Sequence, residues 1–218
     1  MDQDSKRYGV LVIGACGSVS LCSIAGAIAQ SIGLHDSTGM VTGLPEFEHL
    51  GLPSVSSFVF GGWEIRSMPL ADGLTELYRV TRSIDRDTLD AVLPHLTLFQ
   101  SEVRQGISFG LDELYRRFPD AVIVKESAYT AVERVRADIR DFKARKGLAE
   151  VIVVNLSSTE PLPASPFRWH SPDDFRKALL ANDPALTPSI LYAWAALAES
   201  CAYINFTPSV GSELACHR

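Results

Sequence analysis

An apolar strand that runs through a glycine turn into a small-residue helix dominates the start of this chain. The segment reads YGVLVIGACGSVSLCSIAGAIAQ, residues 8–30. Its helix, expected at residues 18–32, is apolar on nearly every face and must be buried against a sheet that contains the strand at 9–13. Dinucleotide-binding domains begin with such a unit, because small residues at a helix N-terminus let a pyrophosphate approach the backbone N–H groups.

The glycine spacing of this turn leaves two interpretations open. Gly14 can form the tight turn, and Gly17 with Ser18 presents a small, donor-rich surface at the helix start, where Ser18 is the expected cap. The spacing is not G-x-G-x-x-G, however, since Cys16 and Ser20 stand where other cofactor folds often have glycine. The pattern alone does not decide between a pyrophosphate site and a structural turn without a ligand.

The uncharged stretch from Tyr8 to Leu34 is also long enough to span a bilayer. The apolar run before Gly14 is only about five residues, as in a buried strand, and serines and glycines interrupt the rest of the stretch. We therefore expect no membrane segment. The chain has 218 residues, of which 46% are apolar and 21% charged, as in ordinary globular proteins. Its net charge of −6 argues against a nucleic-acid partner, which would need clustered Lys and Arg.

The four cysteines indicate neither a metal site nor a disulfide framework. They form no C-x-x-C pair, and only His217, beside the last of them, is a histidine close to any of them in the sequence (Cys16, Cys22, Cys201 and Cys216). This usage is typical of a reducing compartment, and we expect a cytoplasmic protein.

Strands alternate with helices along the rest of the chain, which predicts an α/β fold with a mainly parallel sheet. Strands are expected at 57–65, 120–128, 150–161 and 202–206, and a long loop at 35–57. Helices are expected at 71–83, 85–93, 100–118 and 129–146, with two more starting at Ser171 and Thr187. We expect a single domain over residues 1–218.

Two further strand ends carry candidate ligand residues. Glu64 ends an apolar strand and can accept hydrogen bonds from ribose hydroxyls, although it lies much further along than the usual twenty-odd residues. The hydroxyl residues that come after Asn155 can line a groove at the carboxyl edge of the sheet, although Ser and Thr also cap helices. His95 and His170 have no evident nucleophile partner, and the aromatic residues of LYAWAALAE are expected in the core. No catalytic residue is predicted.

Four segments together resemble the N-terminal half of the myo-inositol-1-phosphate synthase (inositol-3-phosphate synthase) family. They are GVLVIGACGSVS, FVFGGWEIRSMPL, VIVVNLSSTEP and TPSILYAWAALAESCAYINFTPS, and the resemblance runs from Tyr8 to Ser209. It implies a Rossmann-like domain, with helices on both faces of the sheet, that binds NAD. Glu64 matches the family's usual Asp at the adenosine ribose. The pyrophosphate would lie on one turn, and the nicotinamide side would be lined by the strand-end segment (Gly14, Ala15, Cys16, Gly17, Ser18 and Val19; Ser157, Ser158 and Thr159, with Glu160).

The resemblance also implies an activity. Family members are homo-oligomeric enzymes of inositol and phospholipid biosynthesis that convert glucose 6-phosphate to inositol phosphate by oxidation, enolisation, aldol closure and reduction, so that NAD is regenerated. Because Glu64 would repel a 2′-phosphate and only Arg66 lies near it, NAD is expected rather than NADP. The turn departs from the family's common G-x-G-G-x-x-G, and Pro161 stands where many members have Arg.

The family's substrate-binding and catalytic lysines lie in a second half that this sequence does not match. None of the five lysines here corresponds to them (Lys6, Lys125, Lys143, Lys146 and Lys177). We expect the NAD-binding portion of such an enzyme, inactive alone and without the family's C-terminal half. The alternatives are a short nucleotide-binding partner or sensor protein without catalysis, and another NAD-dependent sugar-phosphate oxidoreductase.

Overall fold

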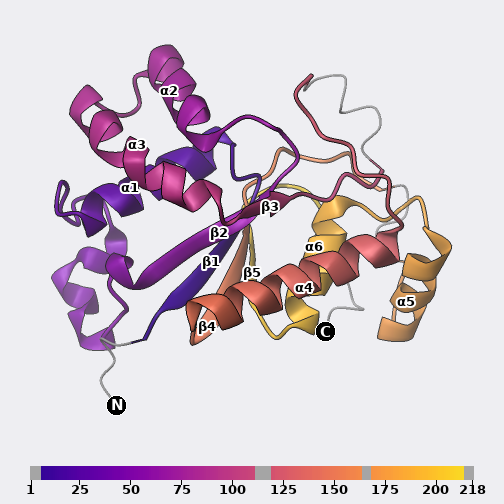
Figure 1. Ribbon diagram of the computed structural model, residues 1–218. Helices are drawn as coiled ribbons and strands as arrows, with labels where there is room; N and C mark the ends of the chain where they lie inside the picture. Colours follow the sequence, from indigo (N-terminus) through magenta and orange to yellow (C-terminus); the bar gives the residue numbers. More distant parts are fainter. Residues whose placement is uncertain (1–5, 111–118, 164–167, 214–218) are drawn as a thin grey trace.

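Five parallel strands form a single sheet in the computed structural model, which describes residues 6–110, 119–163 and 168–213. The strand order is β3-β2-β1-β4-β5, so β1 lies in the centre between β2 and β4 (Figure 1). The chain therefore builds one side of the sheet and then returns to β1 to build the other. The crevice at that reversal, outside the carboxyl ends of β1 and β4, is where open α/β sheets bind ligands. The strands are β1 Tyr8–Ile13, β2 Phe58–Glu64, β3 Val103–Gln105, β4 Glu150–Asn155 and β5 Ala202–Asn205.

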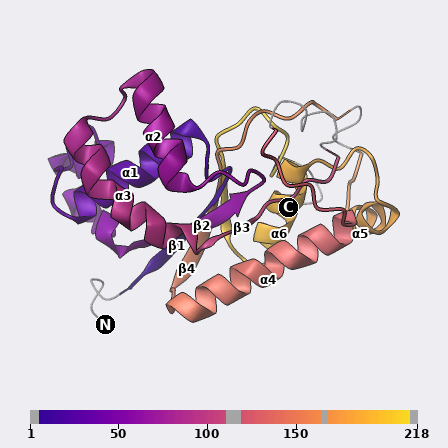
Figure 2. The ribbon, with the colours of Figure 1, turned by 45° about the horizontal axis from the view of Figure 1, so that its top comes forward.

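Helices cover both faces of this sheet, as predicted (Figure 2). One face carries α1 Ser18–Ser31, α2 Leu70–Thr81 and α3 Arg86–Gln100, and the other carries α4 Ala128–Lys146, α5 Pro172–Ala181 and α6 Pro188–Ala198. Each face has its own apolar core, because a parallel sheet must be buried on both sides. The core under α1, α2 and α3 contains Leu21 and Ile24, whose side chains are both 1% exposed.

Trp63, the penultimate residue of β2, belongs to the core under α4, α5 and α6 and lies near the carboxyl edge of the sheet. Its side chain is buried and its Nε1 donates a hydrogen bond to Asp138 Oδ2 of α4 at 2.9 Å. Its ring centroid lies 5.3 Å from that of Tyr192 in α6. An indole needs such a polar partner when it is buried, and here the partner fixes α4 against β2.

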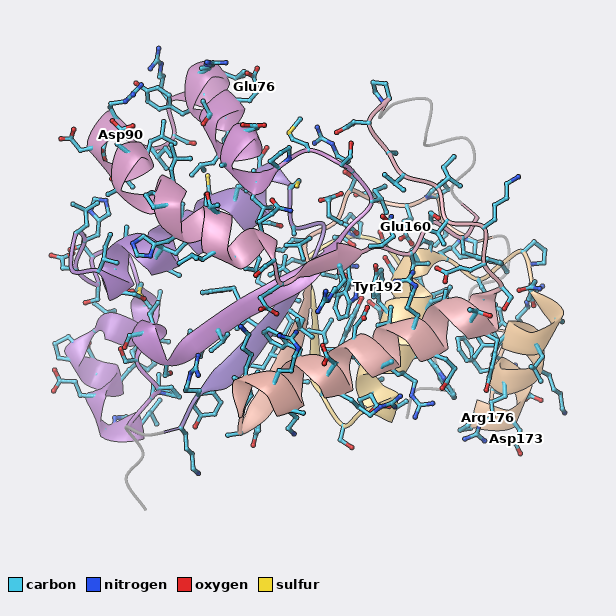
Figure 3. The ribbon with its side chains drawn as sticks, viewed as in Figure 1. Glu76, Asp90, Glu160, Asp173, Arg176 and Tyr192 are labelled. Carbon is cyan, nitrogen blue, oxygen red and sulfur yellow. The ribbon has the colours of Figure 1, made fainter. Side chains whose placement is uncertain are left out.

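The outer faces of the helices carry exposed ion pairs. Arg86 Nε lies 2.8 Å from Asp90 Oδ2 on α3, and Arg176 Nη1 lies 2.9 Å from Asp173 Oδ1 on α5 (Figure 3). Pairs of this kind contribute little to stability in water. No helix in the described part of the chain is long and apolar enough to cross a membrane.

Most of the predicted elements are present at nearly the predicted positions. The predicted strands at 9–13, 57–65 and 202–206 are β1, β2 and β5, and the strand predicted over 150–161 ends at Asn155. Ser171 caps α5 by accepting a hydrogen bond from the backbone of Asp174, with Pro172 in the first turn as expected. The loop at 35–57 contains three short 3-10 helices, η2 Val41–Gly43, η3 Pro45–Leu50 and η4 Val55–Ser57.

The predictions for residues 85–128 are partly wrong. Helix α3 does not stop before Pro94 but continues to Gln100, because its last turns bury Leu96 and Phe99. The helix predicted at 100–118 is replaced over its first part by β3, while 111–118 lie outside the described residues. The strand predicted at 120–128 is not in the sheet; it makes only an isolated antiparallel bridge from Ala121 to Arg66.

Candidate functional site

The turn after β1 requires glycine at position 14. Gly14 has φ +81°, a conformation that L side chains rarely adopt, and a Cβ added there would lie 2.9 Å from the Cα of Ser157. The N–H groups of Gly14 and Ala15 both donate to the carbonyl oxygen of Trp63, at 2.9 and 3.2 Å. The turn is therefore clamped between the ends of β2 and β4, and its close approach to the β4 loop depends on the missing side chain.

Helix α1 begins immediately after this turn. Gly17 is its N-cap and makes no side-chain capping bond, so the prediction that Ser18 caps the helix is wrong. Ser18 already lies in the first helical turn, and the Oγ of Ser20 donates to the Gly14 carbonyl oxygen at 2.7 Å. The first turn contains no acidic residue. Its backbone N–H groups, which have no intrahelical acceptor, thus give the helix end a positive potential beside Gly17.

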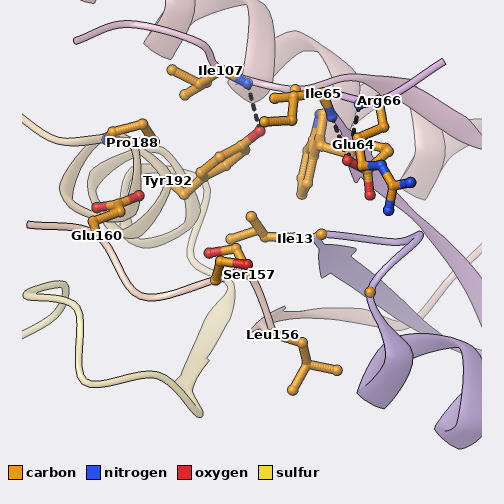
Figure 4. Close-up of a pocket in the computed structure, with 15 residues that line it drawn as sticks. Ile13, Glu64, Ile65, Arg66, Ile107, Leu156, Ser157, Glu160, Pro188 and Tyr192 are labelled. Atoms are coloured by element: carbon orange, nitrogen blue, oxygen red, sulfur yellow. Dashed lines mark hydrogen bonds between the residues drawn. The ribbon is translucent and has the colours of Figure 1, made fainter. Parts of the chain in front are cut away.

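The buried carboxylate of Glu64 joins the glycine turn to the end of β2. Its Oε2 accepts a hydrogen bond from the backbone N–H of Cys16 at 2.7 Å. Its Oε1 accepts from the N–H groups of Ile65 and Arg66 at 2.8 and 3.0 Å (Figure 4). Three backbone donors therefore hold the carboxylate in one orientation.

Asn155 fixes the loop that leaves β4. Its fully buried side chain accepts hydrogen bonds from Ser157 N and Ser157 Oγ at 3.1 and 2.8 Å. Its Nδ2 donates to Ser189 Oγ of α6 at 3.1 Å. The Ser157 hydroxyl is consequently positioned by a buried amide rather than by solvent.

Glu160 lies at the far end of this loop and caps helix α6. Its Oε1 accepts a hydrogen bond from Ser189 N at 3.0 Å, close to the positive end of the helix. Burial raises the pKa of the Glu160 carboxyl above its ordinary value, and the hydrogen bonds from the α6 end oppose this. The carboxyl can therefore hold a proton at a higher pH than an exposed glutamate does.

A pocket of about 140 Å³ connects these features at the carboxyl edge of the sheet. Glu64 and Glu160 lie on opposite sides of it, and the hydroxyl of Tyr192 accepts a hydrogen bond from Ile107 N at 2.8 Å (Figure 4). Burial raises the pKa of Tyr192, which stays neutral. The wall is mostly apolar, with polar groups at both ends (Ile13, Gly14, Gly17, Trp63, Glu64, Ile65, Arg66, Gly106, Ile107, Leu156, Ser157, Ser158, Glu160, Pro188 and Tyr192).

The structure brings half of the predicted ligand residues together in this wall. Gly14, Gly17, Glu64, Ser157 and Ser158 line the pocket. The others do not: two are buried within the turn and three lie on the exposed side of the helix start or the loop (Ala15 and Cys16; Ser18, Val19 and Thr159).

Tyr192 and Ile107 are among the wall residues for which the sequence predicts no contact with a ligand. Tyr192 is buried, as predicted for a core residue, but its edge also faces the pocket. Ile107 comes after β3, in a segment that was predicted to be helical. Only the strand order could have indicated them. Ile107 follows β3, which pairs with β2, and Tyr192 lies in α6, the helix that leads from β4 to β5, so both come near the carboxyl edge of the sheet.

The donor set suits an organic ligand better than a metal ion. Among the described residues, no group of three or more His, Cys, Asp and Glu side chains could hold a metal. The pocket instead combines a helix N-terminus, serine hydroxyls and a carboxylate with an apolar wall, which is the usual chemistry of a nucleotide site.

Comparisons with known proteins give a consistent result. The family model described as myo-inositol-1-phosphate synthase matches residues 8–217. Inositol-3-phosphate synthase 1 of Bacteroides thetaiotaomicron is 28% identical over 218 aligned residues, which cover 94% of this chain and 49% of that protein. Inositol-3-phosphate synthase of Trypanosoma brucei brucei is 30% identical over 155 residues, covering 70% and 28% respectively.

A solved structure has the same fold. The crystal structure of inositol-3-phosphate synthase from Caenorhabditis elegans superposes with a TM-score of 0.80 at 18% identity, over 97% of this chain and 46% of that chain. The chain thus spans about half the length of the first of these relatives and of the solved structure.

Proposed function

Because the chain belongs to the myo-inositol-1-phosphate synthase family, we propose that it binds NAD in the pocket at the carboxyl edge of its sheet. It would serve as the NAD-binding portion of an inositol-3-phosphate synthase-like enzyme. The observation that carries the proposal is the turn at Gly14, where the missing side chain lets the turn lie against Ser157, so that the start of α1 and the loop after β4 line one pocket. The position is the one at which parallel α/β sheets bind dinucleotides.

The residues present fit NAD. The N–H groups at the start of α1, beside Gly17, would receive the pyrophosphate, because that helix end is positive and its first turn contains no acidic residue. Glu64 would accept a hydrogen bond from a hydroxyl of the adenosine ribose. A carboxylate has about four acceptor positions, and the three backbone donors leave one of them for the ribose. Ser157 and Ser158 would border the nicotinamide side, with the apolar wall excluding water.

Bound NAD supplies a hydride acceptor that can return the hydride later in the same cycle. The chain's own contribution would be to orient the cofactor and to keep the reacting end dry, with Glu160 as the carboxyl able to hold a proton there. No lysine is among the described residues that line the pocket, so no amine there could stabilise an enolate. We propose that this chain alone binds NAD without converting glucose 6-phosphate.

A calorimetric titration with NAD tests the binding proposal. The variant Gly17→Val places a branched side chain in the pocket wall and is expected to weaken NAD binding by more than about tenfold. Gly26→Val is the matched control, since it puts the same side chain on the same helix at an exposed position with no atom within 4 Å of the new Cβ. A folded wild-type chain that gives no binding heat, or equal affinity in both variants, would refute the site.

The activity proposal needs a separate assay. The purified chain would be incubated with glucose 6-phosphate and NAD, and inositol phosphate would be measured by chromatography against a full-length relative as positive control. No product is expected. Turnover by this chain would show that its own residues suffice for the chemistry.

A further inference from the structure

Arg66 and Asp120 form an ion pair at the adenosine end of the pocket. Arg66 Nε donates to Asp120 Oδ2 at 3.0 Å and to Oδ1 at 3.3 Å, and both side chains are about three-quarters buried. The Arg66 Nη2 group also lies 3.5 Å from the Met68 sulfur. The guanidinium is therefore held on two sides by groups of the protein.

The segment that carries Asp120 is itself fixed to the end of β2. Its carbonyl oxygen accepts from Ser67 N at 2.9 Å, Val122 N donates to the Ile65 carbonyl at 2.7 Å, and Ala121 bridges to Arg66. A carboxylate on such an anchored segment cannot swing away with little cost, so the ion pair keeps a defined geometry.

Arg66 carries the only positive side chain among the described residues of the pocket wall, and it lies two positions after Glu64. A 2′-phosphate on the adenosine ribose requires a nearby cation, and an Arg close to the strand-end acid accommodates NADP in related folds. This chain thus contains both the acid that selects against NADP and an Arg of the kind that selects for it.

We propose that Asp120 determines cofactor selectivity by holding the Arg66 guanidinium away from the ribose 2′ position. This inference rests on the proposed NAD site. Because Asp120 balances the charge of Arg66, the Glu64 carboxylate gives this end of the wall a net negative charge, which disfavours the 2′-phosphate of NADP. Removal of the Asp120 carboxylate would leave the Arg66 Nε–H group to donate a charge-assisted hydrogen bond to that phosphate.

Fluorescence titrations of the purified chain with NADH and NADPH, at one ionic strength, test this. Asp120→Ala is expected to tighten NADPH binding by about tenfold while NADH affinity changes less than about twofold. The double variant Asp120→Ala/Arg66→Gln should lose the gain, which separates release of Arg66 from simple loss of a negative charge. Asp90→Ala is the matched control, because Asp90 pairs with Arg86 through the same Nε–Oδ2 contact on the outer face of α3.

The outcomes separate the two proposals. A folded wild-type chain that binds neither nucleotide would refute the NAD site and the selectivity inference with it. NADH binding with an unchanged NADPH-to-NADH ratio in Asp120→Ala, or a gain that survives in the double variant, would refute only the role of Asp120. If Asp120→Ala does not fold, Asp120→Asn decides, because it keeps the shape of the side chain and removes its charge: the same selective gain for NADPH is expected, and an unchanged ratio would refute the role of Asp120.

Discussion

The Oε2 atom of Glu64 accepts a 2.7 Å hydrogen bond from the backbone N–H of Cys16, in the middle of the glycine turn. Glu64 therefore has a structural role before any ligand arrives, because it joins the end of β2 to the turn that precedes α1. A buried carboxylate with three backbone donors is costly to remove, since each donor then loses its partner.

Glu64→Gln should accordingly lower both stability and NAD affinity. The amide group of Gln turns a donor toward at least one backbone N–H, so the free energy of unfolding should fall by about 1–3 kcal/mol. NAD binding should weaken by about tenfold or more. Urea denaturation and calorimetry measure the two effects, with Glu76→Gln on the exposed face of α2 as control. If stability is unchanged while affinity falls, the carboxylate serves the ligand alone.

Gly14→Ala tests the close contact between the turn and the β4 loop. The left-handed conformation costs an Ala about 1–2 kcal/mol, and the contact of 2.9 Å with the Ser157 backbone should add about 1–3 kcal/mol. Gly147→Ala is the matched variant, because Gly147 also has positive φ but no atom lies within 4 Å of its added Cβ. Denaturant titrations should find the Gly14 variant clearly less stable; equal losses would mean that the loop yields freely.

Cys16 should be chemically inert in the folded protein. Burial, reinforced by the nearby Glu64 carboxylate, raises the pKa of the Cys16 thiol to about 12, so the reactive thiolate is scarce at pH 8. Iodoacetamide labelling and peptide mass spectrometry should find the partly exposed Cys22 modified well before Cys16. Both should react alike in urea. The Cys16 Sγ also donates to the Met68 carbonyl oxygen at 3.2 Å, and equal labelling rates in the native protein would contradict this buried, hydrogen-bonded thiol.

The stability of Glu160→Gln should differ from wild type in a pH-dependent way. Folding raises the pKa of the Glu160 carboxyl, so the unfolded chain ionises at a lower pH than the folded one. The wild type therefore has its full stability below the unfolded pKa and loses part of it as pH rises through the folded pKa. Melting temperatures measured from pH 4 to 8 should therefore show the variant gaining on the wild type as pH rises. A constant difference would mean that the carboxyl titrates normally.

Glu102→Gln is a control with the opposite pH dependence, because folding lowers the pKa of Glu102 instead of raising it. Hydrogen bonds from Arg145 and Lys146 lower the pKa of Glu102 to about 2, so its stabilising contribution is present above the unfolded pKa and lost as pH falls toward 2. This variant should lose stability relative to the wild type as pH rises from 2 to 5. The two variants together distinguish a local effect of each carboxyl from a general effect of pH.

The sequence predicted the fold well where local pattern and tertiary burial agree. The unbroken apolar runs of β1 and β4 and the proline-and-acid start of α5 determine those elements with little help from the rest of the chain. β3 could not be found this way, because a three-residue strand has no period and exists only through its pairing with Gly62, Trp63 and Glu64.

Sequence motifs predicted only part of the candidate site. The motif residues Gly14, Gly17 and Glu64 lie in the wall, but Tyr192 and Ile107 reach it from elements that carry no signature. The three-donor environment of Glu64 was also beyond the sequence, since it depends on how the turn of β1 meets the end of β2. The pairing of Arg66 with Asp120 needs the fold as well, because the two residues lie 54 positions apart in the chain.

The position of β1 has a consequence for biosynthesis. The first strand of the sheet to leave the ribosome is its central strand, and it finds its second neighbour only when Glu150–Asn155 emerges. Until then one whole edge of β1 is unpaired, and an unpaired apolar strand favours aggregation. Slow synthesis of residues 66–149 would therefore lengthen the time for which this edge is exposed, and would reduce the yield of folded protein even without any mutation.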